Sequence, residues 1–570
     1  MLPTVQETRK IMSESFHIQI QSSLAKILPA WKTEDFAKDT VLTMLQEDRV
    51  SFQAAFQGSN VVRETVSIAV TAPDTLTLRV RTVELVPAAY PCRPWYDDGY
   101  YTHIPGLYPD LLKEPEQKDG LILADAVPGQ WRSIWIDVMS SAQTPPGDYT
   151  VSLRFLAQDG SVLGCAEKGI TVCEGILPGQ TLLHTEWFHT DCLANYYSVT
   201  PWSEEHWNIV EQFLAVYGKH GMNTILTPLF TPPLDTEWGG ERTTVQLVDV
   251  SVTSSGYTFG FEKLRRWVSL CQKHGISRFE FSHLFTQWGA AFAPKIMVWE
   301  NGTYKRRFGW DTPAAGEDYA SFLHAFLPAL KEEIFRLHLE HHVFFHLSDE
   351  PGADQIHSYE QARQIAAADL EGFPSIDALS DYSFYEKGYV SRPVVAANAA
   401  EPFLRKNVSH LWVYYCSAQD TKVSNRFIAM YSQRNRILGV QLYKFQIEGF
   451  LHWGFNFYND MLSRHHINPY LVTDCGCAFP SGDGFLVYPG PNGIPEESIR
   501  LMVLEEGFQD MRALQLLEQL TSREHVLALL EEGLTEELTF SCYPKEDCWI
   551  LELRNRVNRE IMNKLHGICS

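Results

Sequence analysis

The chain has 570 residues, enough for one large domain with one or two companions. Its composition, 45% hydrophobic and 21% charged, is typical of a globular protein and excludes disorder as the main state. Lys and Arg number 47 against 70 Asp and Glu, and the formal net charge of −23 repels phosphate backbones and anionic lipid headgroups, so we expect neither a nucleic-acid nor a membrane partner.

Targeting signals and cysteine usage indicate a compartment. The first twenty residues hold no apolar run ahead of a small-residue cleavage site, and no stretch of 18 apolar residues occurs later. Eleven cysteines, an odd number, fit reduced thiols better than a disulfide framework. We therefore expect a cytoplasmic protein. Cysteines 475 and 477, and 542 and 548, lack the C-x-x-C spacing of structural zinc sites, so no metal is expected there.

Residues 1–178 are expected to form a β-sandwich, because short runs of alternating apolar residues recur there. A Pro-Pro-Gly-Asp turn at 145–148 separates the last two runs, as an antiparallel pair requires. The runs lie at 61–70, 75–86, 133–138 and 149–155.

Residues 179–495 show a different pattern, in which short apolar runs alternate with longer helical ones. This pattern predicts βα units and a parallel sheet, and eight candidate strands predict an α/β domain of the (β/α)8 TIM-like barrel type. The candidate strands lie at 181–189, 222–230, 278–284, 342–350, 375–382, 410–416, 426–430 and 449–458, the seventh being weak. Residues 496–570 are expected to form a C-terminal helical region packed on the barrel.

Several motifs are absent, including G-x-S-x-G, the phosphate loop G-x-x-x-x-G-K-[ST], G-x-G-x-x-G and H-E-x-x-H. Because barrel enzymes carry their chemistry at the C-terminal ends of strands, the run HVFFHLSDEP at 342–351 draws attention. It passes from apolar residues into Asp349 and Glu350. Pro351 is expected to hold Glu350 extended and to end the pairing.

Asp349 and Glu350 are the candidate catalytic pair. Neighbouring strand residues point to opposite faces, so the two carboxylates share a pocket only if the chain leaves the ladder before them. Each disfavours ionisation of the other, and this can keep one protonated as a general acid. The alternative interpretation is a helix cap followed by a solvated charge. Glu186 and Glu448 are kept as possible second carboxylates of a conventional glycosidase.

Other predicted strand ends supply aromatic and polar side chains that suit the faces of sugar rings. Histidines 338, 341, 342 and 346 are interpreted as helix-end or core residues, and no metal or organic cofactor is expected. The candidate substrate-binding residues are Trp187, His189, His283, Tyr382, Trp412, Tyr414, Trp453, Asn456 and Tyr458.

The sequence resembles glycoside hydrolase family 123 and its mostly uncharacterised relatives. The resemblance lies in HLSDEP (346–351), GFLHWGFN (449–456), DGFLVYPGPNG (483–493) and SIRLMVLEEGFQDMRAL (498–514), and residues 135–153 are similar to the sandwich that precedes the barrel in that family. It implies a β-N-acetylgalactosaminidase that retains configuration by substrate assistance. Glu350 would then be the acid and base, and Asp349 would orient the acetamido group.

Three functional hypotheses follow from these observations. The first is a glycoside hydrolase acting on terminal N-acetylhexosaminides. The second is a carbohydrate-binding barrel without turnover, and the third is a glycosidase for a sugar that lacks the acetamido group.

Overall fold

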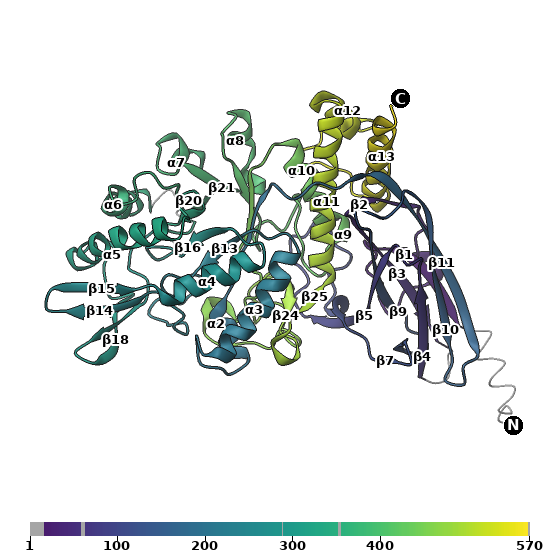
Figure 1. The fold of residues 1–570 in the computed structure, drawn as a ribbon, viewed down its shortest axis with the longest axis horizontal. Helices are drawn as coiled ribbons and strands as arrows, with labels where there is room; N and C mark the ends of the chain where they lie inside the picture. Colours follow the sequence, from purple (N-terminus) through teal and green to yellow (C-terminus); the bar gives the residue numbers. More distant parts are fainter. Residues whose placement is uncertain (1–15, 59–62, 288, 351–354, 568–570) are drawn as a thin grey trace. The chain divides into compact units, whose positions relative to one another are not determined.

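The computed structural model describes residues 16–58, 63–287, 289–350 and 355–567 (Figure 1). The chain folds into two compact units, each built from discontinuous segments. Unit 1 comprises Met1–Gln180, Thr421–Lys444 and Glu496–Ser570, and unit 2 comprises Thr181–Asp420 and Phe445–Pro495. These units do not coincide with three consecutive domains, because residues 421–444 and 496–570 both group with the N-terminal strands.

The strand-rich N-terminal region is confirmed, and it contains two sheets around one apolar core. One sheet runs β1-β3-β9-β5-β6-β25 and the other β2-β11-β10-β4-β8-β7. Ile134, Ile136 and Val138 alternate along β9, so one face of that strand enters the core. The strands are β1 His17–Ser22, β2 Leu42–Gln46, β3 Arg49–Gln57, β4 Glu64–Thr71, β5 Thr77–Ala88, β6 Gly106–Lys113, β7 Gln117–Lys118, β8 Leu121–Ala126, β9 Arg132–Met139, β10 Gly147–Leu156, β11 Val162–Ile176 and β25 Glu496–Ser498.

Among the described residues of unit 1, five α-helices accompany the strands, and Figure 1 shows α13 beside β2 and β11. Asn555 on α13 accepts a hydrogen bond from the Thr43 backbone N–H at 3.0 Å, and Asn558 donates to the Thr43 carbonyl at 3.1 Å. These side-chain contacts explain why the C-terminal helices group with the sandwich strands. The helices are α9 Ser432–Arg436, α10 Leu438–Lys444, α11 Ile499–Leu520, α12 Arg523–Glu531 and α13 Asp547–Leu565.

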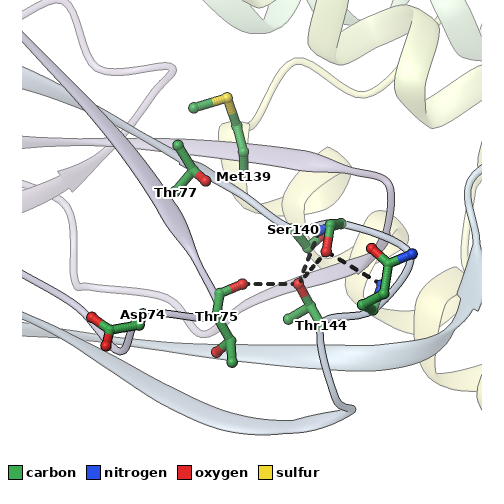
Figure 2. Close-up of a pocket in the computed structure, with 8 residues that line it drawn as sticks. Asp74, Thr75, Thr77, Met139, Ser140 and Thr144 are labelled. Carbon is green, nitrogen blue, oxygen red and sulfur yellow. Dashed lines mark hydrogen bonds between the residues drawn. The ribbon is translucent and has the colours of Figure 1, made fainter.

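A polar hollow of about 270 Å³ lies in unit 1 beside the turn before β10 (Figure 2). Thr144 donates its hydroxyl to the Thr75 carbonyl at 2.9 Å and accepts the Ser141 N–H at 2.9 Å. The polar atoms of this hollow therefore bind one another and close the turn.

Unit 2 contains a nearly closed barrel of eight parallel strands in the order β19-β16-β13-β12-β23-β22-β21-β20. Followed around the barrel from β12 through β19 and β20 to β23, the strands occur in the same order as in the sequence. The seam between β19 and β20 is joined by a single bridge, Phe345 to Ser375. The strands are β12 Leu183–Glu186, β13 Thr224–Thr227, β16 Arg278–Phe281, β19 Val343–Phe345, β20 Ile376–Leu379, β21 Arg392–Ala396, β22 Trp412–Tyr414 and β23 Gly449–His452.

Seven of the eight predicted strands are confirmed, but the weak candidate at 426–430 is wrong. That segment belongs to unit 1 and forms only an isolated bridge, Tyr100 to Met430. The missing barrel strand is β21, which sequence reasoning passed over.

Helices and a small second sheet connect the barrel strands. In α4, the buried residues Leu264, Trp267, Val268 and Cys271 follow the i, i+3, i+4, i+7 spacing of a helix with one apolar face. The helices are α2 Thr190–Tyr196, α3 Glu204–Lys219, α4 Glu262–Lys273, α5 Glu317–Arg336, α6 Ile356–Ala367, α7 Tyr382–Glu386 and α8 Glu401–Arg405. The sheet β15-β14-β17-β18 contains β14 Asp249–Thr253, β15 Gly256–Gly260, β17 Ile296–Glu300 and β18 Thr303–Phe308.

In the described ranges, none of the helices combines the length and the apolar character needed to cross a bilayer.

Candidate active site

A cavity of about 160 Å³ lies where the barrel strands end. Because the strands are parallel, their C-terminal ends meet at one mouth, and the segments that follow them line the cavity. The lining residues are Trp187, Leu234, Asp235, Gln287, Asp349, Glu350, Ala378, Tyr414, Cys416, Ser417, Leu451, Trp453 and Phe479. Five of them, Trp187, Asp349, Glu350, Tyr414 and Trp453, are candidates from the sequence.

Asp349 and Glu350 both line this cavity because β19 ends at Phe345, well before them. Glu350 has a backbone φ of 43°, in the left-handed region, so the expected extended conformation is wrong. The Tyr414 hydroxyl donates to Glu350 Oε1 at 2.6 Å. This bond holds the carboxylate in the cavity and compensates the unusual backbone, which costs about 1–3 kcal/mol.

The electrostatics of the cavity favour protonated carboxyls. Burial raises the pKa of Asp349 well above its ordinary value, and the neighbouring charge of Glu350 raises it further. Burial also raises the pKa of Asp235 to about 6, although the Leu462 N–H and Arg242 oppose the shift. The site therefore has carboxyl groups that titrate above the usual range.

The two tryptophans of the cavity are fixed by their indole N–H groups. Trp187 Nε1 donates to Glu280 Oε2 and Trp453 Nε1 donates to Asp483 Oδ2, each at 3.0 Å. Since each indole donor is bound to a buried carboxylate, the parts left for a ligand are the apolar ring surfaces. Such surfaces suit the C–H faces of a sugar.

Below the pair, Glu280 and Asp377 flank His346 in a buried network. The His346 Nε2 lies 3.0 Å from Glu280 Oε2, and its Nδ1 lies 3.5 Å from Asp377 Oδ1. Burial alone would lower the pKa of His346, but these carboxylates outweigh it and raise the pKa to about 9.

His189, His283 and Trp412 do not line the cavity. His189 donates from Nε2 to the Trp453 carbonyl at 2.8 Å and accepts from Arg242 at 3.0 Å, and burial and Arg242 lower its pKa to about 4. His283 is buried and stacks on His346 with ring centres 4.3 Å apart. Trp412 fills the barrel core against Phe344.

Tyr382, Asn456 and Tyr458 also lie outside the cavity lining. Tyr382 begins α7 and packs edge-on against Phe403. Asn456 accepts from the His189 N–H at 2.9 Å and donates to the His189 carbonyl at 3.1 Å. The buried Tyr458 donates to the Val487 carbonyl at 2.8 Å.

The reserve carboxylates Glu186 and Glu448 are likewise outside the lining. Glu186 is buried and lies 3.1 Å from the Nε2 of His184. Glu448 precedes β23 and pairs with Arg392 at 2.5 Å, at the opposite end of the strands from the cavity.

Sequence reasoning missed several residues of the site. Asp235 and Gln287 lie on long connections after β13 and β16, where no periodic pattern marks them. Glu280 and Asp377 had a usable signal, because each is a charged residue inside a short apolar strand, where burial requires a partner.

The profile of the family described as "Glycoside hydrolase 123, catalytic domain" matches residues 187–517, more than half of the chain, and this range contains every cavity-lining residue. The chain belongs to glycoside hydrolase family 123. It is a glycoside hydrolase that acts on glycans.

Solved structures agree with this family 123 assignment at the level of fold. A family 123 glycoside hydrolase from Clostridium perfringens, studied for glycolipid glycan hydrolysis, aligns with a TM-score of 0.71 at 15% identity, over 97% of this chain and 98% of that one. A family 2 β-galacturonidase from Eisenbergiella tayi aligns with a TM-score of only 0.30 at 8% identity, over 87% and 71%, too low to indicate a shared fold. No curated protein sequence matches the chain.

Proposed function

We propose that this family 123 hydrolase removes terminal N-acetylhexosamine of the N-acetylgalactosamine type, with retention, using the substrate's own acetamido group as nucleophile. The observation that carries the proposal is the placement of two adjacent carboxylates, Asp349 and Glu350, in one cavity with tryptophan walls. Such a site needs no nucleophile from the protein, because the attacking oxygen belongs to the substrate.

In the first step, Glu350 donates a proton to the glycosidic oxygen while the acetamido oxygen attacks the anomeric carbon. The bond to the aglycone breaks, the aglycone leaves as an alcohol, and an oxazolinium ion forms. In the second step, the Glu350 carboxylate takes a proton from a water that attacks the same carbon, and the oxazolinium ring opens. Two inversions at one carbon give net retention.

Asp349 acts on the acetamido group. Its carboxylate accepts the acetamido N–H and stabilises the positive charge that grows on that group as the ring closes. The stabilising form is the ionised one, whereas burial and Glu350 raise the pKa of Asp349. We therefore expect kcat to fall on the acidic side as Asp349 becomes protonated.

The positions of the other carboxylates support substrate assistance. Glu186 and Glu448 lie outside the cavity lining, so neither faces a sugar bound beside Glu350. Asp235 is the remaining carboxyl among the described lining residues, so it is the one candidate there for a protein nucleophile and is tested below. Trp187 and Trp453 present ring faces to the sugar.

A comparison of 4-nitrophenyl 2-acetamido and 2-hydroxy glycosides tests the proposal. We expect wild type to hydrolyse the 2-acetamido substrate and to leave the 2-hydroxy one nearly untouched. The change Asp349→Asn should lower kcat on the order of 10²-fold while raising KM less, since the lost contact strengthens in the transition state. A thiazoline mimic of the oxazolinium ion should bind wild type far more tightly than the product sugar, and lose that advantage in the variant.

The matched control is Asp381→Asn, which removes one carboxylate at the N-cap of α7, outside the cavity lining, and keeps a side chain that caps well. It should leave both kinetic constants unchanged. Equal turnover of the two glycosides, or a covalent 2-fluoro sugar adduct on Asp235, would show a conventional retaining glycosidase instead.

A further inference from the structure

A buried imidazole, that of His346, lies three residues before Asp349 in the chain, directly after β19. His346 is 1% exposed, and each of its ring nitrogens faces a carboxylate oxygen, Glu280 at 3.0 Å and Asp377 at 3.5 Å. A carboxylate accepts and does not donate, so this geometry favours a proton on both nitrogens. The two carboxyl groups raise the pKa of His346 to about 9 and so favour the imidazolium form of the ring.

The two carboxylates that face His346 also hold parts of the cavity. Glu280 Oε2, which faces the ring, accepts the indole N–H of Trp187 at 3.0 Å. Asp377 Oδ1 accepts the backbone N–H of Leu347 at 3.0 Å, two residues before Asp349, and the hydroxyl of Tyr359 binds its other oxygen. One histidine thus connects a cavity wall to the backbone that carries the catalytic pair.

We propose that His346 is a positioning residue of this hydrolase, whose cation holds Glu280 and Asp377 together and, through them, fixes the Trp187 indole and the backbone that carries Asp349. The proposal deepens the proposed function, on which it rests for the role of Asp349. This role accounts for an ion cluster inside the barrel, where the removal of charges from water costs free energy.

The same cation acts on Asp349 through space. Burial and Glu350 raise the pKa of Asp349, His346 lowers it, and Asp377 raises it. Two aromatic rings also lie against His346: His283, whose pKa burial and His346 lower well below its ordinary value, and the edge-on ring of Trp187 at 5.9 Å. His346 is thus the positive charge that favours the ionised form of Asp349.

The first test is His346→Gln, a change that keeps a polar side chain but removes the charge. We expect kcat to fall on the order of 10²-fold, because a misplaced reacting group costs about that much. The acidic limb of the kcat–pH profile should also move to higher pH, because Asp349 loses the cation that favours its ionised form. A role in folding alone would lower stability without moving that limb.

The control is His206→Gln, which replaces another fully buried histidine, hydrogen-bonded at 3.0 Å to the Thr190 carbonyl and outside the cavity lining. It should lower the midpoint of thermal unfolding and leave the acidic limb where it is. The pair of variants therefore separates loss of a buried imidazole from loss of this cation.

A second variant gives a test of opposite sign and remains informative if His346→Gln does not fold. Asp377→Asn keeps a carbonyl oxygen for the Leu347 N–H but removes an anion that raises the pKa of Asp349. The acidic limb should move to lower pH, the reverse of the shift in His346→Gln. The proposal would be overturned if the acidic limb moved in the same direction in His346→Gln and Asp377→Asn. It would also be overturned if both variants lost kcat while the acidic limb of each stayed where it is in wild type.

Failure of the role of His346 and failure of the proposed function give different results in these experiments. Each variant is compared with wild type on whichever 4-nitrophenyl glycoside wild type hydrolyses faster. If wild type shows no preference for the 2-acetamido sugar, the proposed function fails. The ratio of kcat between variant and wild type then still shows whether His346 positions the pair, and an unchanged ratio overturns that role.

Discussion

Glu350 combines a left-handed backbone with an exposed position, and both features suit the acid that we propose it to be. The φ of 43° turns the side chain away from the line of β19, and the hydroxyl of Tyr414 holds it at 2.6 Å. A residue in an extended strand end would place its carboxylate and that of Asp349 on opposite faces. The strained position is therefore what brings the two side chains into one cavity.

The change Glu350→Gln should cut kcat by about 10²–10⁴-fold on an alkyl glycoside, whose leaving group needs a proton. The loss should be much smaller on an activated phenyl glycoside, whose leaving group departs with little protonation. Steady-state rates on the two substrates measure the difference. Equal losses on both would contradict the role of Glu350 as an acid.

At this scale, sequence alone could predict the pair and part of its surroundings. Asp349 and Glu350 were recognisable because polar residues ended an apolar strand, and Tyr414 because it closed another. The sequence could not show that His189 lies outside the cavity lining, because its hydrogen-bond partner Arg242 comes from a distant loop. Contacts between loops far apart in sequence leave no local periodic signal.

Secondary-structure elements, like single residues, were predictable where the signal is local in the sequence. Apolar runs predicted seven barrel strands, because a strand buried on both faces needs apolar residues along its whole length. The run 426–430 was equally apolar but is buried in unit 1 without a ladder, while β21 was missed because Pro393 interrupts it. Which apolar segment pairs with which is decided by the tertiary fold.

The close crossing of α10 and α11 depends on Gly439. A Cβ at Gly439 would lie 1.7 Å from the Gly507 carbonyl oxygen, which belongs to the backbone of the facing helix. Gly439→Ala should destabilise the protein by about 3 kcal/mol, the upper end of ordinary overpacking, because a backbone has little freedom to move. The midpoint of urea unfolding measures this change.

Gly169→Ala is the matched control for that substitution. Gly169 lies on β11, and a Cβ there would meet no atom within 4 Å. Its unfolding midpoint should stay close to that of wild type. A similar loss in both variants would show that the tight helix crossing is not the cause.

On the scale of the whole molecule, unit 1 is held together by buried ion pairs as well as by its apolar core. Asp137 on β9 pairs with Arg81 and, at 3.0 Å, with Arg49. Arg81 also pairs with Glu497 of β25, a residue more than 400 positions away in sequence. Burial opposes ionisation of Asp137, but the arginines and hydrogen bonds prevail and lower its pKa.

This lowered pKa predicts an acid-sensitive fold. A carboxyl whose pKa is lower in the folded state contributes stability that is complete above its unfolded pKa, about 3.9, and is lost as the pH falls through the folded value. Asp137→Asn should cost about 3 kcal/mol near pH 7, the lower end for breaking a buried ion pair, because Arg49 and Arg81 lose one carboxylate and keep Glu505 and Glu497 as partners. Its unfolding free energy should also fall less steeply than that of wild type below about pH 4.

Urea unfolding of wild type and Asp137→Asn between pH 3 and 7 measures both effects. Asp119→Asn provides the control, since Asp119 is exposed and its left-handed φ of 52° suits asparagine equally well. Parallel profiles for wild type and Asp137→Asn would contradict the prediction.

The discontinuous make-up of unit 1 has a consequence for synthesis on the ribosome. The buried residues of the apolar core between its sheets lie within residues 42–172, and Phe16, Ile18 and Ile20 pack against them, so the core can close soon after this segment emerges. At about 5–20 residues per second, α11, which contacts Arg49 through Met502 and Glu505, follows residue 180 by on the order of 15–65 s. During that interval Arg49, Arg81 and Asp137 are exposed to water on the sheet face that is later covered, and all three are charged. A charged face resists aggregation while its partners are still being made, which an apolar face of the same area would not.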